Sequence, residues 1–172
     1  MSSIDLLLLG SGGHCKVLIE LAKLLGNKKF GVFDDVLNPS INNMEGVLFL
    51  GKYDIKLYPN IPLVIAIGNN EIRATLSKNS NHEFATLIHP SAIISKSVEV
   101  GKGTVILSNV VIQAGANIGN HVIVNASSVI DHDVIIQDFV HLRPLSYIGS
   151  NSEISKYLTI NPAQIVERFS KL

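Results

Sequence analysis

The chain has 172 residues, the length of one or two small domains. It carries 14 Lys plus Arg and 14 Asp plus Glu, and this zero net charge argues against a nucleic-acid partner, because a phosphate backbone is bound by clustered basic side chains. A hydrophobic fraction of 47% excludes general disorder, while one cysteine and no early apolar run near the ~20 residues that cross a bilayer predict a cytoplasmic protein without membrane insertion.

The first half of the chain alternates apolar strands with helical patterns. Residues 4–9 form an apolar run, and a helix-spaced pattern follows at Val17, Leu18, Leu21, Leu24 and Leu25 before Gly26. Further strands are expected at 30–33, 47–50 and 63–67, with a helix over 71–78. Strands that alternate with helices predict an α/β unit with a parallel sheet, which we place at residues 1–87.

A glycine-rich turn and an acidic strand end give this unit the pattern of a nucleotide site. The turn is Gly10-Ser11-Gly12-Gly13-His14, and its backbone N–H groups can approach a phosphate at the start of a helix. Asp34 and Asp35 end the second strand, where an acidic residue commonly binds a ribose hydroxyl. The unit is too short for a two-half dinucleotide fold, which favours a nucleotide-linked substrate over NAD. A merely tight turn is the alternative interpretation.

Two other residues of this half have a chemical and a structural interpretation. Cys15 opens the helix, where the dipole lowers a thiol pKa, but a small residue in the third glycine position is the favoured explanation. Arg73 either contacts a phosphate or lies on a solvated helix face.

The second half repeats with a period of six. Stepping by six from Ile88 gives only aliphatic residues: Ile88, Ile94, Val100, Ile106, Ile112, Ile118, Val124, Ile130, Ile136, Leu142, Ile148, Ile154 and Ile160. Four residues after each aliphatic position, the side chain is small or β-branched with one exception: Ala92, Val98, Thr104, Val110, Ala116, Val122, Ser128, Val134, Val140, Ser146, Ser152 and Leu158. This period fits neither a helix nor simple strand alternation, and it is typical of a parallel β-helix.

Each hexapeptide of such a β-helix supplies one short strand and one corner, so about 18 residues close a triangular coil. The aliphatic residue points inward and stacks on its copy in the next coil, ~4.8 Å away. We place the β-helix at residues 88–160 and a C-terminal tail at 161–172. The segment 164–172 is expected to cap the stack as a short amphipathic helix, because solenoids need capped ends.

Histidines within the repeat are the candidates for catalysis. Asp131-His132-Asp133 places an imidazole between two carboxylates, which can orient it and stabilise its protonated form as a general base requires. A surface histidine beside two solvated acids is the alternative, and we interpret His121 in that way. A zinc site built from His121, His132 and His141 is disfavoured, because these histidines are spaced 11 and 9 apart. No metal site is predicted.

The ordered set of motifs resembles the bacterial sugar O- and N-acetyltransferases of the PglD and NeuD type, over almost the whole chain. The motifs are Gly10 to His14, Phe33-Asp34-Asp35, Ala66-Ile67-Gly68-Asn69-Asn70-Glu71-Ile72-Arg73, Ile88-His89-Pro90-Ser91-Ala92, Asn125 to Asp133, and Asn161-Pro162-Ala163. The stretches 66–73 and 125–133 look most like enzymes that acetylate a UDP-linked 4-amino sugar. The resemblance implies a Rossmann-like nucleotide-binding domain followed by a left-handed parallel β-helix.

The resemblance also implies partners and roles. These are acetyl-CoA as co-substrate with no permanently bound cofactor, a UDP-linked amino sugar as acceptor, and a homotrimer with active sites between adjacent subunits. By resemblance, His132 is the base, with Asp133 and Asp131 orienting it. The substrate-binding residues are Gly10, Ser11, Gly12, Gly13, His14, Asp34, Asp35, Gly68, Asn69, Asn70, Arg73 and Asn125, and acetyl-CoA lies near His141, Ser146 and Gly149.

The chain departs from this family in the length of its repeat. Family members usually continue for about two coils beyond the stretch matched by Tyr147-Ile148-Gly149, whereas here the repeat runs directly to Asn161-Pro162-Ala163. Two alternatives to an N-acetyltransferase therefore stay open. One is an O-acetyltransferase of the sialic acid type, and the other is a non-catalytic, trimeric sugar-nucleotide-binding homologue that has lost CoA.

Overall fold

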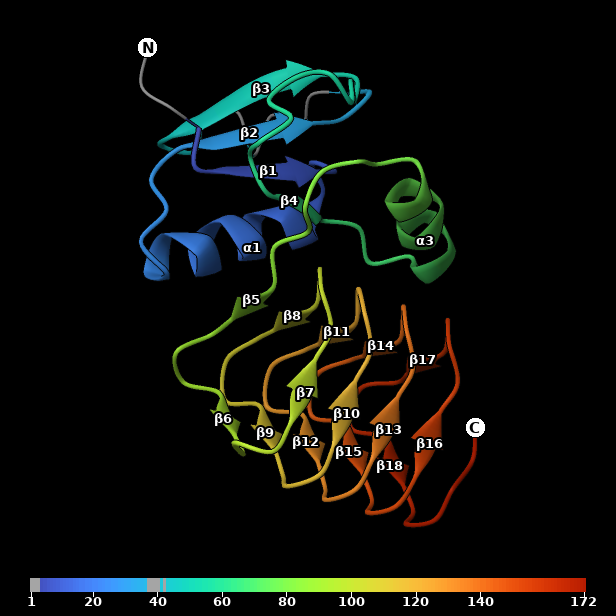
Figure 1. Ribbon diagram of the computed structural model, residues 1–172. Coiled ribbons are helices and arrows are strands. Elements are labelled where there is room, and N and C mark those ends of the chain that lie inside the picture. Colours follow the sequence, from blue (N-terminus) through green and yellow to red (C-terminus); the bar gives the residue numbers. More distant parts are fainter. Residues whose placement is uncertain (1–3, 37–40, 42) are drawn as a thin grey trace. The chain divides into compact units, whose positions relative to one another are not determined.

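The computed structural model describes residues 4–36, 41 and 43–172. The chain divides into two compact units, Met1–Ala85 and Thr86–Leu172, which are described separately (Figure 1).

The first unit is built on a parallel sheet with the strand order β3-β2-β1-β4. The strands are β1 (Leu6–Leu9), β2 (Phe30–Phe33), β3 (Val47–Gly51) and β4 (Leu63–Ile65). Every residue of β1, β2 and β4 is buried, which explains why these strands read as continuous apolar runs rather than alternating ones. The predicted parallel α/β architecture is confirmed.

Helices α1 (Gly13–Leu24) and α3 (Asn70–Lys78) accompany this sheet. Helix α1 follows β1 and buries its apolar stripe, including Leu18 and Leu21. Helix α3 follows β4 and begins at a side-chain cap, because Asn69 Oδ1 accepts a hydrogen bond of 3.0 Å from the backbone N–H of Ile72. Both helices thus begin just after the carboxyl end of a strand, at the edge of the sheet where parallel α/β units hold their ligands.

The second unit is a parallel β-helix with three sheets. One sheet holds β5 (Leu87–Ile88), β8 (Val105–Ile106), β11 (Ile123–Val124), β14 (His141–Leu142) and β17 (Thr159–Ile160). The next holds β6 (Ile93–Ile94), β9 (Val111–Ile112), β12 (Val129–Ile130), β15 (Tyr147–Ile148) and β18 (Ile165–Val166). The third holds β7 (Glu99–Val100), β10 (Asn117–Ile118), β13 (Ile135–Ile136) and β16 (Glu153–Ile154).

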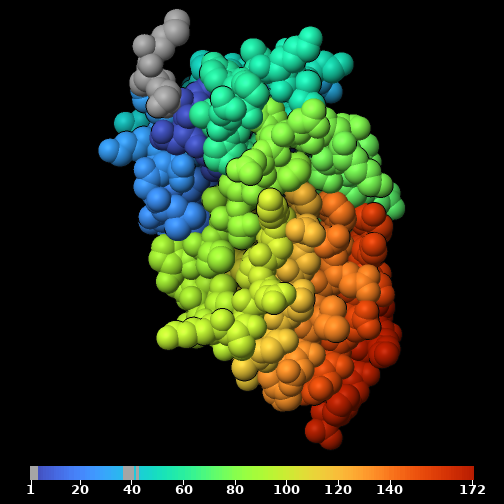
Figure 2. Space-filling model, in the orientation of Figure 1, coloured from blue at the N-terminus to red at the C-terminus, as the bar shows by residue number. Residues whose placement is uncertain are grey.

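Strand pairing confirms the coil of 18 residues. Asn117 pairs with Ile135 and Ile123 pairs with His141, each 18 positions further along the chain. Successive coils therefore lie directly on one another, and their atoms form one continuous surface in the space-filling view (Figure 2).

The two repeating positions of the hexapeptide both face inward. From Ile106 to Ile160 the aliphatic position is at most 3% exposed, and the small position is at most 1% exposed from Thr104 to Ser152. Three hydroxyl groups at the small position, those of Thr104, Ser128 and Ser152, donate to carbonyl groups of a neighbouring turn, as in the 2.8 Å bond from Thr104 Oγ1 to the oxygen of Gly119. Burial of polar side chains inside this stack is therefore compatible with an apolar core.

The corners require an unusual backbone conformation. Every sixth residue from Gly103 to Phe169 has a positive φ, including bulky residues such as Phe139 (φ 60) and Leu145 (φ 63). That conformation costs an L-residue about 1–2 kcal/mol. At one corner, ring stacking offsets the cost: the centroids of His121 and Phe139 lie 5.1 Å apart, and those of Phe139 and Tyr157 lie 5.6 Å apart.

The C-terminal segment differs from the expected helix. Residues 165–166 form β18, which pairs with β15, and Lys171 bridges to Glu153. The predicted cap helix over 164–172 is wrong, because Val166 lies six residues after Ile160 and continues the inward aliphatic position at 4% exposure. The segment expected as a tail thus contributes to the stack.

Two adjacent isoleucines of β13 have the same side chain but differ in burial. Ile136 is 1% exposed and Ile135 is 47% exposed. We expect Ile136→Ala to lower the free energy of unfolding by about 2–5 kcal/mol, because it leaves a cavity inside the stack. The matched Ile135→Ala should cost well under half as much. Chemical denaturation of the two variants measures both values, and equal losses would contradict the inward stack.

Candidate functional site

The turn between β1 and α1 leaves open space over two of its glycines. Gly10 has φ +108, and a Cβ there would lie 2.7 Å from Ile67 Cγ1, so the fold itself requires this glycine. At Gly12 and Gly13, a Cβ would meet no described atom within 4 Å. Packing within the described chain therefore does not demand glycine at these two positions. Gly12 and Gly13 are exposed at the start of α1, the end of a helix that favours a phosphate.

The acidic end of β2 is tied to this turn. The carboxylate of Asp34 accepts hydrogen bonds from the backbone N–H of Ser11 at 2.6 Å and of Val36 at 3.3 Å. Partial burial works against the charged form of Asp34, but hydrogen bonds from Ser11 and its neighbours outweigh it and lower the pKa of this carboxyl group. The structure thus brings together the glycine turn and Asp34, as the motif predicted, and keeps the carboxylate ionised.

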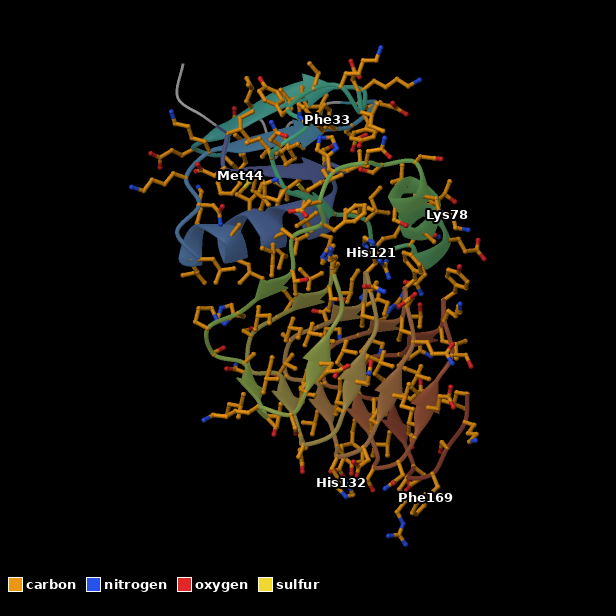
Figure 3. The ribbon with its side chains drawn as sticks, in the orientation of Figure 1. Phe33, Met44, Lys78, His121, His132 and Phe169 are labelled. Atoms are coloured by element: carbon orange, nitrogen blue, oxygen red, sulfur yellow. The ribbon has the colours of Figure 1, made fainter. Side chains whose placement is uncertain are left out.

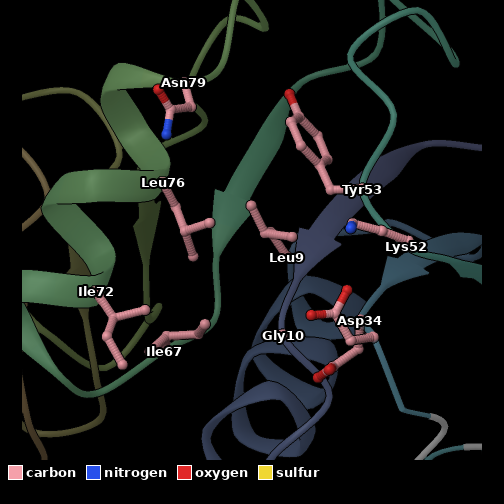
Figure 4. Close-up of a pocket in the computed structure, with 10 residues that line it drawn as sticks. Leu9, Gly10, Asp34, Lys52, Tyr53, Ile67, Ile72, Leu76 and Asn79 are labelled. Atoms are coloured by element: carbon pink, nitrogen blue, oxygen red, sulfur yellow. The ribbon is translucent and has the colours of Figure 1, made fainter.

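A cavity of about 390 Å³ opens beside Asp34 (Figure 4). Its lining residues are Leu9, Gly10, Asp34, Asp35, Lys52, Tyr53, Ile67, Ile72, Leu76 and Asn79. The cavity has an apolar wall from β1, β4 and α3 and a charged rim from the ends of β2 and β3. Such a combination suits a ligand with a flat apolar body and polar attachments.

Sequence reasoning missed the lysine and tyrosine of this cavity. Lys52 and Tyr53 follow β3, whose last residue, Gly51, accepts a hydrogen bond of 2.9 Å from the backbone N–H of Asp34. Parallel pairing of β2 with β3 therefore carries Lys52 to the same edge as Asp34. The register between β2 and β3 is the signal that would have predicted Lys52 at this site.

The tyrosine is held rigidly in this wall. Its ring meets Phe33 edge-on with centroids 5.2 Å apart. Its hydroxyl oxygen lies 2.8 Å from Ser80 Oγ and 2.9 Å from His82 Nδ1. Tyr53 thus presents a preformed apolar surface to the cavity.

The loop after β4 is braced by a buried arginine. The Arg73 guanidinium donates hydrogen bonds to the carbonyl oxygens of Ile67 at 3.0 Å and Gly68 at 3.2 Å, and to Asn70 Oδ1 at 2.7 Å. Burial lowers the pKa of Arg73 to about 10. Arg73 is 1% exposed, so it does not lie on a solvated helix face, and its hydrogen bonds shape the loop 67–70. Asn69, also expected at the substrate, is exposed and caps α3.

The helix-opening cysteine is inert. Cys15 is fully buried, and burial, with a smaller contribution from the charge of Asp34, raises the pKa of its thiol to about 12. The structural explanation for this residue is thereby supported over a reactive thiolate.

In the β-helix, Asp131-His132-Asp133 forms the outward corner between β12 and β13, and His132 projects away from the coils (Figure 3). His132 Nδ1 lies 2.8 Å from Asp133 Oδ2, and the backbone N–H of His132 donates to Asp131 Oδ1 at 2.7 Å. The side chain of His132 is 50% exposed. With Nδ1 bound to Asp133, the other ring nitrogen, Nε2, can accept a proton from a substrate.

The carboxylates tune this imidazole. The hydrogen bond to Asp133 raises the pKa of His132, and the charges of Asp131 and Asp133 add to that rise. The protonated form is thus stabilised, as a general base requires once it has taken a proton.

Asn125 and His141 lie at a different corner from His132. Asn125 follows β11 and His141 begins β14 one coil further on, and Asn125 Nδ2 lies 3.5 Å from His141 Nε2. Along the chain, strand β12 separates Asn125 from the His132 corner, and strand β13 separates that corner from His141. The structure therefore unites Asn125 with His141 but leaves His132 at the next corner of the coil.

Two residues expected near acetyl-CoA are parts of the stack. Ser146 is 1% exposed, and its hydroxyl donates to Ser128 Oγ at 3.1 Å inside a corner. Its side chain is therefore turned into the stack, and the expectation that acetyl-CoA lies near Ser146 stays a prediction. At Gly149 a Cβ would lie 2.6 Å from the backbone nitrogen of Arg168, so close packing of coils already requires this glycine.

Within residues 4–36, 41 and 43–172, no three or more His, Cys, Asp or Glu side chains converge as a metal ion would need. In the same described part of the chain, no helix is long and apolar enough to cross a membrane.

Comparisons with known proteins confirm the resemblance that the motifs indicated. Residues 5–79 match the PglD N-terminal domain family. The chain is 38% identical over 111 residues to a UDP-N-acetylbacillosamine N-acetyltransferase of Bacillus subtilis strain 168, a match that covers 59% of this chain and 50% of that enzyme. The matched region thus spans half the length of this relative.

Solved structures match nearly the whole chain. The acetyltransferase domain of PglB from Neisseria gonorrhoeae FA1090 has a TM-score of 0.75 and 26% identity, covering 99% of this chain and 91% of that chain. Its complex with acetyl coenzyme A has a TM-score of 0.72 and 28% identity, covering 99% and 88%. A mutant of a Caulobacter crescentus GDP-perosamine N-acetyltransferase, in complex with CoA and GDP-perosamine, has a TM-score of 0.72 and 26% identity, covering 98% and 88%. The predicted order of a Rossmann-like unit and a β-helix is confirmed.

The burial of the Cys15 thiol can be tested with a thiol reagent. With the pKa of Cys15 at about 12, about one thiol in ten thousand is ionised at pH 8. We expect 5,5′-dithiobis(2-nitrobenzoate) to leave the folded protein unmodified at pH 8 and to react with one thiol per chain in guanidinium chloride. Rapid reaction of the folded protein would contradict the burial of Cys15.

Proposed function

We propose that this protein is an acetyl-CoA-dependent N-acetyltransferase that acts on a nucleotide-linked amino sugar of the UDP type. The observation that carries the proposal is the outward His132 corner, with its two carboxylates, on a β-helix that follows a nucleotide-type α/β unit. The similarity to a bacillosamine N-acetyltransferase and to a domain solved with acetyl coenzyme A supports it. We place the reaction in the cytoplasm, where it would prepare amino sugars for cell-surface polysaccharides.

The reaction needs only a base and correct placement of two substrates. The neutral sugar amine attacks the carbonyl carbon of the acetyl thioester, and His132 Nε2 takes the proton that the nitrogen loses. The C–S bond then breaks, and the CoA thiolate leaves and gains a proton. In this proposal the amine attacks the thioester directly, without an acyl-enzyme, and the rate comes from positioning and from general base catalysis.

The cavity of the first unit would hold the nucleotide. Asp34 and Asp35 are suited to the ribose hydroxyls, and the apolar wall opposite them is suited to the base. Lys52 adds one positive charge at the rim. The glycine turn at Gly12 and Gly13, which are exposed at the start of α1, is suited to the diphosphate, in keeping with a chain whose net charge is zero.

A homotrimer completes this proposal. In one chain, His132 and the Asn125–His141 pair occupy different corners of the coil. A second copy packed alongside would bring its Asn125 and His141 towards the first copy's His132, so that acceptor, base and acetyl group meet between subunits. The outward positions of the sheet between these corners are apolar, which suits such packing: Ile93, Val111, Val129, Tyr147 and Ile165.

Removal of the base tests the activity directly. We expect His132→Ala to lower kcat for acetyl transfer from acetyl-CoA to a UDP-4-amino sugar by about 100-fold or more. Activity near that of the wild type would contradict the assignment.

Calorimetry on His132→Ala and Asp34→Ala separates effects on catalysis from effects on nucleotide binding. His132→Ala should bind UDP as tightly as the wild type does, whereas Asp34→Ala should bind it at least about tenfold more weakly. Wild-type protein that binds UDP but not acetyl-CoA would instead favour the non-catalytic homologue.

Mixing two inactive variants tests the shared site. His132→Ala and Asn125→Ala should each be inactive alone, yet refolding them together should restore part of the activity. The reason is that mixed trimers contain interfaces with an intact His132 from one subunit and an intact Asn125 from the other. No restoration, with trimers seen by light scattering, would place each site within one chain.

A further inference from the structure

A tyrosine from the neighbouring coil contacts the base corner. Tyr147 occupies the outward position of β15, which pairs with β12, the strand that leads into this corner. Its hydroxyl donates a hydrogen bond of 3.1 Å to Asp131 Oδ2. The other oxygen of the same carboxylate, Oδ1, accepts the backbone N–H of His132 at 2.7 Å. One carboxylate therefore joins the tyrosine to the histidine.

We propose that Tyr147 is a positioning residue for the His132 base, acting through Asp131. It holds the Asp131 carboxylate against the corner, so that this acid keeps a fixed place beside the imidazole. The catalytic meaning of this arrangement rests on the function proposed above, but the arrangement itself does not.

Exposure of the corner explains why the carboxylate needs a second anchor. Asp131 is partly exposed, and His132 and Asp133 are exposed. A free carboxylate at such a corner would rotate towards water, where distance and screening weaken its attraction for a protonated imidazole. A hydrogen bond from the next coil ties it to the rigid stack instead.

The charges around the corner define the direction in which the pKa of His132 should shift. Asp131 and Asp133 both raise the pKa of His132. On the tyrosine side, the hydrogen bond to Asp131 raises the pKa of Tyr147, with a smaller contribution from the charge of Glu167. Tyr147 therefore stays a neutral hydrogen-bond donor around neutral pH. If the hydroxyl is removed, the carboxylate is released and the pKa of His132 should fall.

The substitution Tyr147→Phe removes the hydroxyl group but keeps the aromatic ring. Tyr147 also belongs to the apolar stripe of its sheet, and Phe keeps that packing. We expect Tyr147→Phe to lower the pKa of His132, followed by NMR of its ring Cε1–H, by about 0.3–0.5 unit. We further expect kcat for acetyl transfer to fall by about 3- to 10-fold with KM unchanged. The acid limb of the pH profile should move to lower pH by the same shift.

Two comparisons make this test specific. Asp131→Asn should lower the pKa of His132 at least as much, and adding Tyr147→Phe to it should cause no further change, because the tyrosine acts only through the acid. The matched control is Tyr157→Phe, which removes the hydroxyl of another partly exposed tyrosine of the β-helix and should leave His132 unchanged.

An unchanged or higher pKa of His132 in Tyr147→Phe would overturn the proposal, as would independent, additive shifts in the double variant. The NMR titration needs no substrate, so failure of the proposed function is a separate result. A coupled pKa shift in a protein without acetyl transfer would support the Tyr147–Asp131–His132 arrangement and contradict only the activity.

Discussion

The stacking of identical aliphatic positions at every sixth residue is the constraint on which the second unit depends. Because each coil takes 18 residues, Ile118, Ile136 and Ile154 lie one above another, and the inward side chains exclude water along the whole stack. Hydrogen bonds between coils follow from the same register. A deletion of one residue would move every later side chain to the wrong face, so the period leaves little freedom for the inward positions.

This constraint confines the chemistry to outward corners. At the small inward positions of the stack, polar groups are hydroxyls with hydrogen-bond partners: Thr104 donates to a carbonyl oxygen, and Ser146 donates to the hydroxyl of Ser128. At a corner, the chain takes a positive φ at Asp133 (φ 57), a conformation that aspartate tolerates better than most residues. The same turn directs His132 outward between two acids. The geometry needed to close a coil thus also presents the proposed base to a substrate, and the next coil supplies Tyr147 to steady it.

In the first unit, some residues of the candidate site fix the binding loop and others line the cavity. The motif 66–73 looked like a run of ligand-binding residues, yet Arg73 turns inward and fixes the loop and Asn69 caps α3, while Ile67 and Ile72 line the cavity wall. A charged residue beside a binding loop can support the site indirectly, by donating hydrogen bonds that fix the backbone carbonyl groups of that loop. Conversely, the exposed ends of β2 and β3 supply Asp34 and Lys52, which come from segments far apart in the sequence.

The sequence by itself determined the two-unit order, the coil of 18 residues, the inward positions and the pairing of the glycine turn with Asp34. Each of these follows from local periodicity or from a motif within a few dozen residues. It did not predict the strand at 165–166, the inward hydroxyl of Ser146, the brace at Arg73 or the contact from Tyr147 to Asp131. The strand pairing and the contacts of Ser146 and Tyr147 join residues 16 to 18 positions apart, which meet only after the chain has coiled. The brace at Arg73 joins residues three to six positions apart, but it depends on how α3 packs over the loop before it. Only the tertiary structure decides such meetings, because burial and hydrogen bonding are set by neighbours that local sequence does not specify.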